Sequence, residues 1–154
     1  MHDPRLDPLA DLLIKHSTRL EQGEKILIET FDIPEDMVIA LIRAARKGGG
    51  VPLVSCKQNR IQRELIQAGQ EEAMQTIGEC ETYRMERVQA YIGLRGSRNV
   101  AELSDVSAAA MELYERHWVQ PVHFQVRVPK TKWVVLRWPS ASMAQQAKMS
   151  TDAF

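Results

Sequence analysis

The sequence has no excess of charge of either sign. It carries 20 basic and 20 acidic side chains, so its formal net charge is zero at neutral pH. Proteins that bind nucleic acid or an anionic membrane surface usually carry a basic excess. No apolar run approaches the roughly 20 residues that a membrane-spanning helix needs. We therefore expect no nucleic acid and no membrane among the partners of this chain.

Cysteines and short catalytic motifs are also scarce. Cys56 and Cys80 are the only cysteines among the 154 residues, and no CxxC pair predicts a zinc or redox site. Free thiols, together with an N-terminus that lacks an apolar signal core, favour a cytoplasmic protein. The phosphate-binding motifs GxGxxG and GxxxxGK[ST] do not occur, and neither does the zinc-binding motif HExxH. His117 and His123 are six positions apart, which is too far for them to share one helical face. The chain by itself predicts no catalytic residue and no metal ligand.

What the sequence does contain is first of all a strand–helix–strand unit. Lys25–Phe31 is short, apolar and β-branched, which predicts a strand buried on both faces. Asp32 can cap the following helix, which has one apolar face and ends at Gly48–Gly50. Val51–Ser55 predicts a second strand, parallel to the first and reached by a right-handed crossover.

The remaining sequence continues this alternation of helices and strands. Glu71–Met85 predicts a helix rich in glutamate, and Val88–Arg95 and Lys132–Trp138 predict two further strands. The alternation is typical of an α/β fold with a largely parallel open sheet and helices on both faces. No linker, repeat or low-complexity segment divides residues 1–154, so we expect one domain.

Residues 119–131 allow two interpretations. Pro121 disfavours the interior of a helix, because it lacks an N–H and its ring clashes with the preceding turn. His123–Val128 alternates between apolar and polar residues, as a strand would. The alternative is a helix that persists past Pro121, and the sequence does not decide between the two.

Ligands of open parallel sheets bind beyond the carboxyl ends of the strands. This rule selects three loops, Phe31–Glu35, Arg95–Asn99 and Trp138–Ser142. Arg95 and Arg98 could hold a phosphate or a carboxylate, and the alternative is a solvated turn with two surface arginines. Ser97 and Ser140 complete the candidate ligand-facing residues.

The last five residues, Ser150–Phe154, read as the cap and first turn of a further helix. Because an isolated turn is not stable, we expect the chain to be the N-terminal part of a longer protein. The alternative is a frayed tail. An N-terminal part should expose an apolar patch where the remainder docks, and Trp138, Met143 and Met149 are the candidates for its rim.

Four segments, in their order and spacing, are similar to a known family. They are QGEKILIET at Gln22–Thr30, LIRAARKGGGVPLV at Leu41–Val54, YIGLRGSRNVAELSDV at Tyr91–Val106 and KWVVLRWPSASMAQQAKMS at Lys132–Ser150. Together they resemble the N-terminal half of the metal-dependent aminopeptidases of the aminopeptidase T and aminopeptidase S type. Ser140 stands where that family more often has Thr, and Ala147-Lys148 where it has Ala-Gly, so the chain resembles a divergent member.

The resemblance implies a two-domain enzyme, usually a dimer, that removes N-terminal amino acids from peptides. Such enzymes use two divalent ions, zinc or cobalt, to activate the attacking water. Their metal ligands belong to the C-terminal half, and no position of this chain matches them. The resemblance also implies a helix that continues past Pro121. Two other functions stay open: a stand-alone α/β module that binds a phosphate- or carboxylate-bearing ligand, and a non-catalytic remnant of the enzyme.

Overall fold

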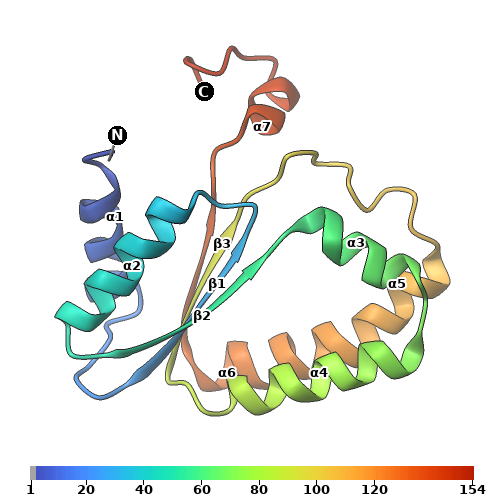
Figure 1. The fold of residues 1–154 in the computed structure, drawn as a ribbon, viewed down its shortest axis with the longest axis horizontal. Coiled ribbons are helices and arrows are strands. Elements are labelled where there is room, and N and C mark those ends of the chain that lie inside the picture. The colour runs from blue at the N-terminus through green and yellow to red at the C-terminus, as the bar shows by residue number, and fades with distance from the viewer. Residues whose placement is uncertain (1–2) are drawn as a thin grey trace.

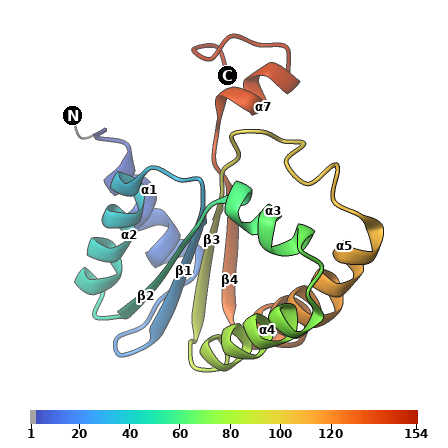
Figure 2. The ribbon, with the colours of Figure 1, turned by 45° about the vertical axis from the view of Figure 1, so that its right-hand side comes forward.

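The structure is a computed structural model that describes residues 3–154, and Met1 and His2 lie outside the described residues. A parallel sheet lies between two layers of helices (Figures 1 and 2). In chain order the elements are α1 (Leu6–Leu12), η1 (Leu13–Ser17), β1 (Lys25–Phe31), α2 (Glu35–Lys47), β2 (Val51–Lys57), α3 (Asn59–Gln67), α4 (Glu71–Met85), β3 (Ala90–Arg95), α5 (Ala108–Tyr114), η2 (Glu115–Arg127), α6 (Val128–Lys130), β4 (Lys132–Arg137) and α7 (Ala141–Gln146).

The strand order explains why the helices divide between the two faces. The sheet has four strands in the order β2-β1-β3-β4, and each neighbouring pair is parallel. From β1 the chain crosses to β2 in one direction, whereas the crossovers to β3 and β4 run in the other. Because crossovers are right-handed, opposite directions place their helices on opposite faces. The predicted α/β fold with a parallel sheet is confirmed.

The first face of the sheet, covered by α1 and α2, is closed by apolar side chains. The fully buried members of this core share small or branched apolar side chains that interdigitate without polar partners. They include Ile14, Ile26, Ile28, Met37, Leu41, Ile92 and Leu94. Alternate residues of β1 and β3 point to this face, as the strand period requires.

The second face, covered by α4 and η2, is apolar over only part of its area. Leu27 and Tyr91 of the sheet pack there against Met74 of α4 and against Trp118 and Val122 of η2. The apolar contact ends before the carboxyl ends of the strands, where charged side chains take over.

Residues 108–130 form one continuous helical stretch, α5–η2–α6, so the strand interpretation of His123–Val128 is wrong. The helix persists past Pro121, as the family resemblance implied. Pro121 has no backbone N–H to donate within the helix, and the chain passes it as the π-helical segment η2. A Cβ on Gly78 of α4 would lie 1.8 Å from the carbonyl oxygen of His117 in η2, so only glycine lets α4 pack this closely.

The predicted cap of α2 is also wrong. Helix α2 begins at Glu35 after Pro34, and no side chain caps it. Asp32 adopts a positive φ of 49°. Its carboxylate instead accepts hydrogen bonds from Asn59, at 2.7 Å from Nδ2 and 3.3 Å from the backbone N. Asp32 therefore ties the loop after β1 to the start of α3.

The end of the described chain extends away from the sheet (Figures 1 and 2). Met149 is 45% exposed, and Trp138 and Met143 are half-buried. The apolar patch with these residues at its rim stays a prediction. Separately, no helix within residues 3–154 has both the length and the apolar character needed to traverse a bilayer.

Candidate functional site

The last residues of the four strands form one row across the sheet. Phe31 of β1 is in register with Lys57 of β2 and with Arg95 of β3. Arg95 is in turn in register with Arg137 of β4. Residues in register in a parallel sheet point to the same face. The carboxyl edge therefore presents three cations and one aromatic ring toward the helices of the second face.

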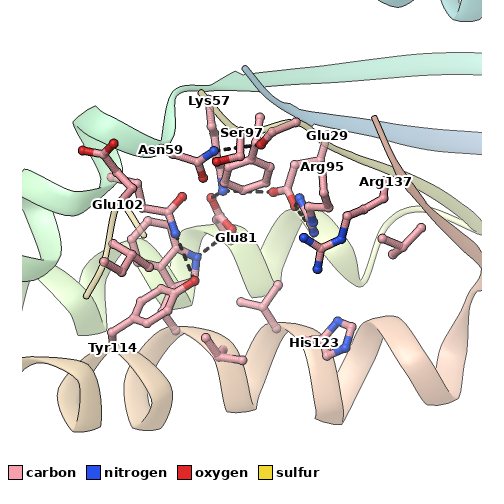
Figure 3. Close-up of a pocket in the computed structure, with 18 of the residues that line it drawn as sticks. Glu29, Lys57, Asn59, Glu81, Arg95, Ser97, Glu102, Tyr114, His123 and Arg137 are labelled. Carbon is pink, nitrogen blue, oxygen red and sulfur yellow. Dashed lines mark hydrogen bonds and ion pairs between the residues drawn. The ribbon is translucent and has the colours of Figure 1, made fainter. Parts of the chain in front are cut away.

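A cavity of about 660 Å³ opens along this row. Its other walls are α4, the α5–η2 helix and the loop that follows β3, and Figure 3 shows the polar side chains that converge on it. The cavity lies where the strand order reverses, beyond the ends of β1 and β3. Ligand sites of open parallel sheets occur at this topological position.

Glu29 of β1 lies at the back of the cavity and is only 2% exposed. Its Oε1 accepts a hydrogen bond from Tyr91 Oη at 2.7 Å and two from Arg95 at 3.2 Å, and lies 3.5 Å from Arg127 Nη2. Its Oε2 lies 2.9 Å from Lys57 Nζ. Burial by itself raises the pKa of the Glu29 carboxyl, but Lys57, the two arginines and the tyrosine hydroxyl lower that pKa to about 2.

Arg127 of η2 reaches the same cluster from the helical wall. It is 6% exposed, and its guanidinium carbon lies 3.9 Å from the centre of the Tyr91 ring. Its Nη1 lies 3.3 Å from His123 Nδ1, while its buried Nε has no hydrogen-bond partner. Burial, together with the charges of Arg127 and Arg95, lowers the pKa of His123, so the imidazole is neutral at neutral pH.

A second carboxylate of the cavity, Glu81, is partly buried and has a partner for each of its oxygens. Glu81 of α4 forms an ion pair with Lys57, which also binds Glu29. The other oxygen of Glu81 accepts a hydrogen bond from Trp118 Nε1 at 2.9 Å, and the ammonium of Lys57 lies 5.0 Å from the centre of a Trp118 ring. Lys57 thus connects two carboxylates and an aromatic side chain across the cavity.

The structure brings some of the predicted site residues together and separates others. Arg95 and Ser97 line the cavity, whereas Arg98 lines a smaller pocket of about 330 Å³ beside Asp32. Ser140 lies outside both, with its Oγ 3.0 Å from Ser142 Oγ. A ligand-binding role for these four predicted residues stays a prediction.

Five residues of the cluster were not found from the sequence: Glu29, Lys57, Tyr91, Arg127 and Arg137. One signal was present, because Glu29 stands within a strand predicted to be buried on both faces, and a buried carboxylate needs partners. The partners of Glu29 themselves come from three other elements, β2, β3 and η2. Gly93 also matters, since a Cβ there would lie 2.8 Å from Tyr91 Oη and displace the hydroxyl that binds Glu29.

The residues that the structure describes do not fit a metal site. No group of three or more His, Cys, Asp or Glu side chains within residues 3–154 could hold a metal ion. Glu29 and Glu81 are already paired with cations, and a cationic wall disfavours a divalent cation. We therefore assign no metal ligand among residues 3–154.

Several solved structures match this chain, including the following two. Wild-type AmpT from Thermus thermophilus matches with a TM-score of 0.67 and 17% sequence identity, over 88% of this chain and 36% of that chain. A putative transcription repressor of the LacI family from Corynebacterium glutamicum matches with a TM-score of 0.35 and 10% identity, over 86% of this chain and 59% of that chain, and carries no argument. The AmpT likeness shows a shared fold, and the chain spans little more than a third of the length of AmpT.

No curated protein matches the sequence. A family model does: the one described as "Thermophilic metalloprotease (M29)" matches residues 2–154, nearly the whole chain. This match confirms the resemblance seen in the sequence segments. The chain belongs to the thermophilic metalloprotease family.

Proposed function

We propose that this chain is the N-terminal domain of a metal-dependent aminopeptidase that removes N-terminal residues from peptides. The observation that carries the proposal is the family match over residues 2–154. The fold shared with AmpT, over 36% of that longer chain, supports it. In this proposal the α/β domain forms one wall of the substrate cleft.

The metal ions of the proposed enzyme, zinc or cobalt, belong to a C-terminal part that is not in this sequence. When bound there, the divalent ions would supply an activated water and a contact for the substrate amine. The residues of this chain would position the peptide instead. We further propose that the enzyme is a cytoplasmic homodimer and that the 154 residues alone do not hydrolyse peptides.

The experiment begins with the intact mass of the protein in its native cell. A mass well above 17.5 kDa would show that this chain is a part of a longer protein. That protein should release N-terminal residues from peptides, lose this activity with a chelator and regain it with zinc or cobalt. Activity that survives chelation, or cleavage confined to internal peptide bonds, would contradict the proposal.

A second candidate function is a stand-alone binding module for a phosphate- or carboxylate-bearing ligand. The observation that favours it is the cavity at the carboxyl edge of the sheet, with its surplus of cations. A native mass near 17.5 kDa without peptidase activity would favour this candidate, or a non-catalytic remnant, over the enzyme domain.

A further inference from the structure

The charged groups of the cavity are distributed unevenly. Its walls carry the cations Lys57, Arg95, Arg127 and Arg137 and the carboxylates Glu29, Glu81 and Glu102. Lys57 is shared between Glu29 and Glu81. In Figure 3, Glu102 lies near Asn59 at one end of the cavity, and Arg137 lies by Arg95 and above His123 at the other. Three arginines lie at that second end, and the carboxylate of Glu29 pairs with two of them, Arg95 and Arg127, so the end is positively charged.

Two of these arginines have unused hydrogen-bond donors. Arg137 makes no ion pair and no side-chain hydrogen bond with any residue of the described chain, although its strand places it in register with Arg95. Two like charges in register repel each other, which an anion between them would relieve. Arg127 is 6% exposed, and its Nε has no hydrogen-bond partner within residues 3–154. A buried donor without an acceptor is costly, so Arg127 favours a further acceptor, and the exposed Arg137 has its donors free for one.

The wall beside this end of the cavity is apolar. Trp133 and Val135 precede Arg137 on the same face of β4, and Val122 of η2 also lines the cavity. Trp133 and Val135 are 42% and 41% exposed, unusually open for large side chains of a sheet. A ligand that combines an anionic group with an apolar body would satisfy the arginines and cover this wall at once.

We propose that the arginine end of this cavity binds the C-terminal carboxylate of a short peptide. The guanidinium of Arg137 would bind the carboxylate through two parallel hydrogen bonds, with Arg95 and Arg127 adding positive charge. Trp133 and Val135 would contact the side chain of the last peptide residue. The volume of about 660 Å³ lies within the roughly 300–1,000 Å³ of small-ligand pockets.

The choice of a peptide rests on the proposed function, whereas the anion site itself rests on the contacts above. The surroundings favour a carboxylate over a phosphate. A guanidinium binds either anion through two hydrogen bonds, but the adjoining wall is apolar rather than built from the backbone N–H groups that commonly hold phosphate. A peptidase that holds the far end of its substrate in this way would select short peptides with a free C-terminus.

The test uses the protein at the length that the native intact mass gives, in isothermal titration calorimetry at low salt. The probe is N-acetyl-trialanine, whose blocked amine prevents removal of an N-terminal residue, compared with N-acetyl-trialanine amide and with inorganic phosphate. We expect binding of the acid and roughly tenfold to a hundredfold weaker binding of the amide, the usual value of a hydrogen bond to a charged group. Arg137→Ala should weaken binding of the acid by a similar factor, and Arg137→Lys should restore part of it.

Arg98→Ala is the matched control, because Arg98 has the same charge, follows β3, the strand that neighbours the β4 strand of Arg137, and lies outside the cavity. It should leave the affinity for the acid unchanged. Thermal unfolding of the Arg137 variants should match that of the parent chain, since Arg137 is exposed and unpaired in the described structure. Equal affinity for acid and amide, equal effects of Arg137→Ala and Arg98→Ala, or binding of phosphate but not of the peptide acid would each overturn the inference.

The outcome can be separated from that of the proposed function. Binding that depends on the free carboxylate and on Arg137 upholds the peptide site even if the native protein does not cleave peptides. Aminopeptidase activity of the native protein, together with absence of such binding, would uphold the proposed function and overturn this inference.

Discussion

The two faces of the sheet are built from the same strands but differ in the side chains that they bury. Ile28 and Glu29 are neighbours in β1 and are 0% and 2% exposed. Ile28 packs among apolar side chains of the first face. Glu29 is surrounded by three cations and a tyrosine on the second face. One strand therefore carries an apolar core on one side and an ionic cluster on the other.

The two faces differ in how strictly each depends on the identity of its side chains. An apolar face tolerates exchange of side chains of similar volume, because burial of apolar area is not directional. An ionic cluster depends on every partner, because a charge left alone in the interior is costly. The first face accordingly holds the layers together, and the second face places charged groups at the carboxyl edge, where ligands bind.

We expect the largest effect from Glu29→Ala, which removes the carboxylate from the ionic cluster of the second face. The variant leaves Lys57, Arg95 and Arg127 close together without the carboxylate between them. We expect the free energy of unfolding to fall by about 3–5 kcal/mol at neutral pH, the usual effect of breaking a buried ion pair. Urea unfolding measures it. A loss below about 1 kcal/mol would mean that the cations separate or that water enters the cluster.

Acid should also distinguish the two faces. The pKa of Glu29 falls from 4.5 to about 2 on folding. A lowered carboxyl pKa contributes stability above the unfolded value, and this contribution is lost as the pH falls from about 5 toward 2. The expected loss from Glu29 is about 3 kcal/mol, at about 1.4 kcal/mol for each pKa unit. Urea unfolding at several pH values measures it, and in Glu29→Gln this part of the acid sensitivity should be absent. An identical pH dependence in both proteins would contradict the assignment.

Gly93→Ala tests how the cluster is positioned. The new Cβ would lie 2.8 Å from Tyr91 Oη, so the ring must move and its hydrogen bond to Glu29 must weaken. We expect a loss of about 1–3 kcal/mol in the free energy of unfolding, as for other overpacked interiors. The loss should be smaller in a Tyr91→Phe background, where the clashing hydroxyl is absent. Additive effects in this double-mutant cycle would show that the two positions are not coupled.

Ile28→Val should have the smallest effect. It removes one methylene from the apolar face, and we expect a loss of about 0.5–1.5 kcal/mol. Because no titrating group is involved, the loss should be the same at pH 7 and at pH 3. A difference that varies with pH would mean that the two faces are not independent.

Much of the fold was predictable because it depends on local patterns. The strand at Lys25–Phe31 and the helix at Glu71–Met85 have the predicted bounds, since short β-branched runs and glycine stops act within a few residues. The sequence left His123–Val128 undecided between a strand and a helix, and the structure shows a helix. Gly78 of α4 packs against the His117 carbonyl of this helix, and no pattern within the segment encodes that contact.

The candidate site was less predictable than the fold. The loop rule placed Arg95 and Ser97 at the cavity, because the carboxyl ends of parallel strands meet at one edge of the sheet. It also selected Arg98 and Ser140, which lie outside the cavity. A loop rule specifies which end of the sheet matters but not the face toward which each side chain points.

The sequence by itself determined the α/β class, most strand positions and the family, because periodicity, turn residues and characteristic segments are local features of the chain. Only the tertiary structure decided that Glu29 meets Lys57, Arg95 and Arg127, residues from four different elements. Strand order and register set these meetings, and both depend on contacts between segments far apart in sequence. The cation-rich cavity is therefore a property of the folded sheet and its helices.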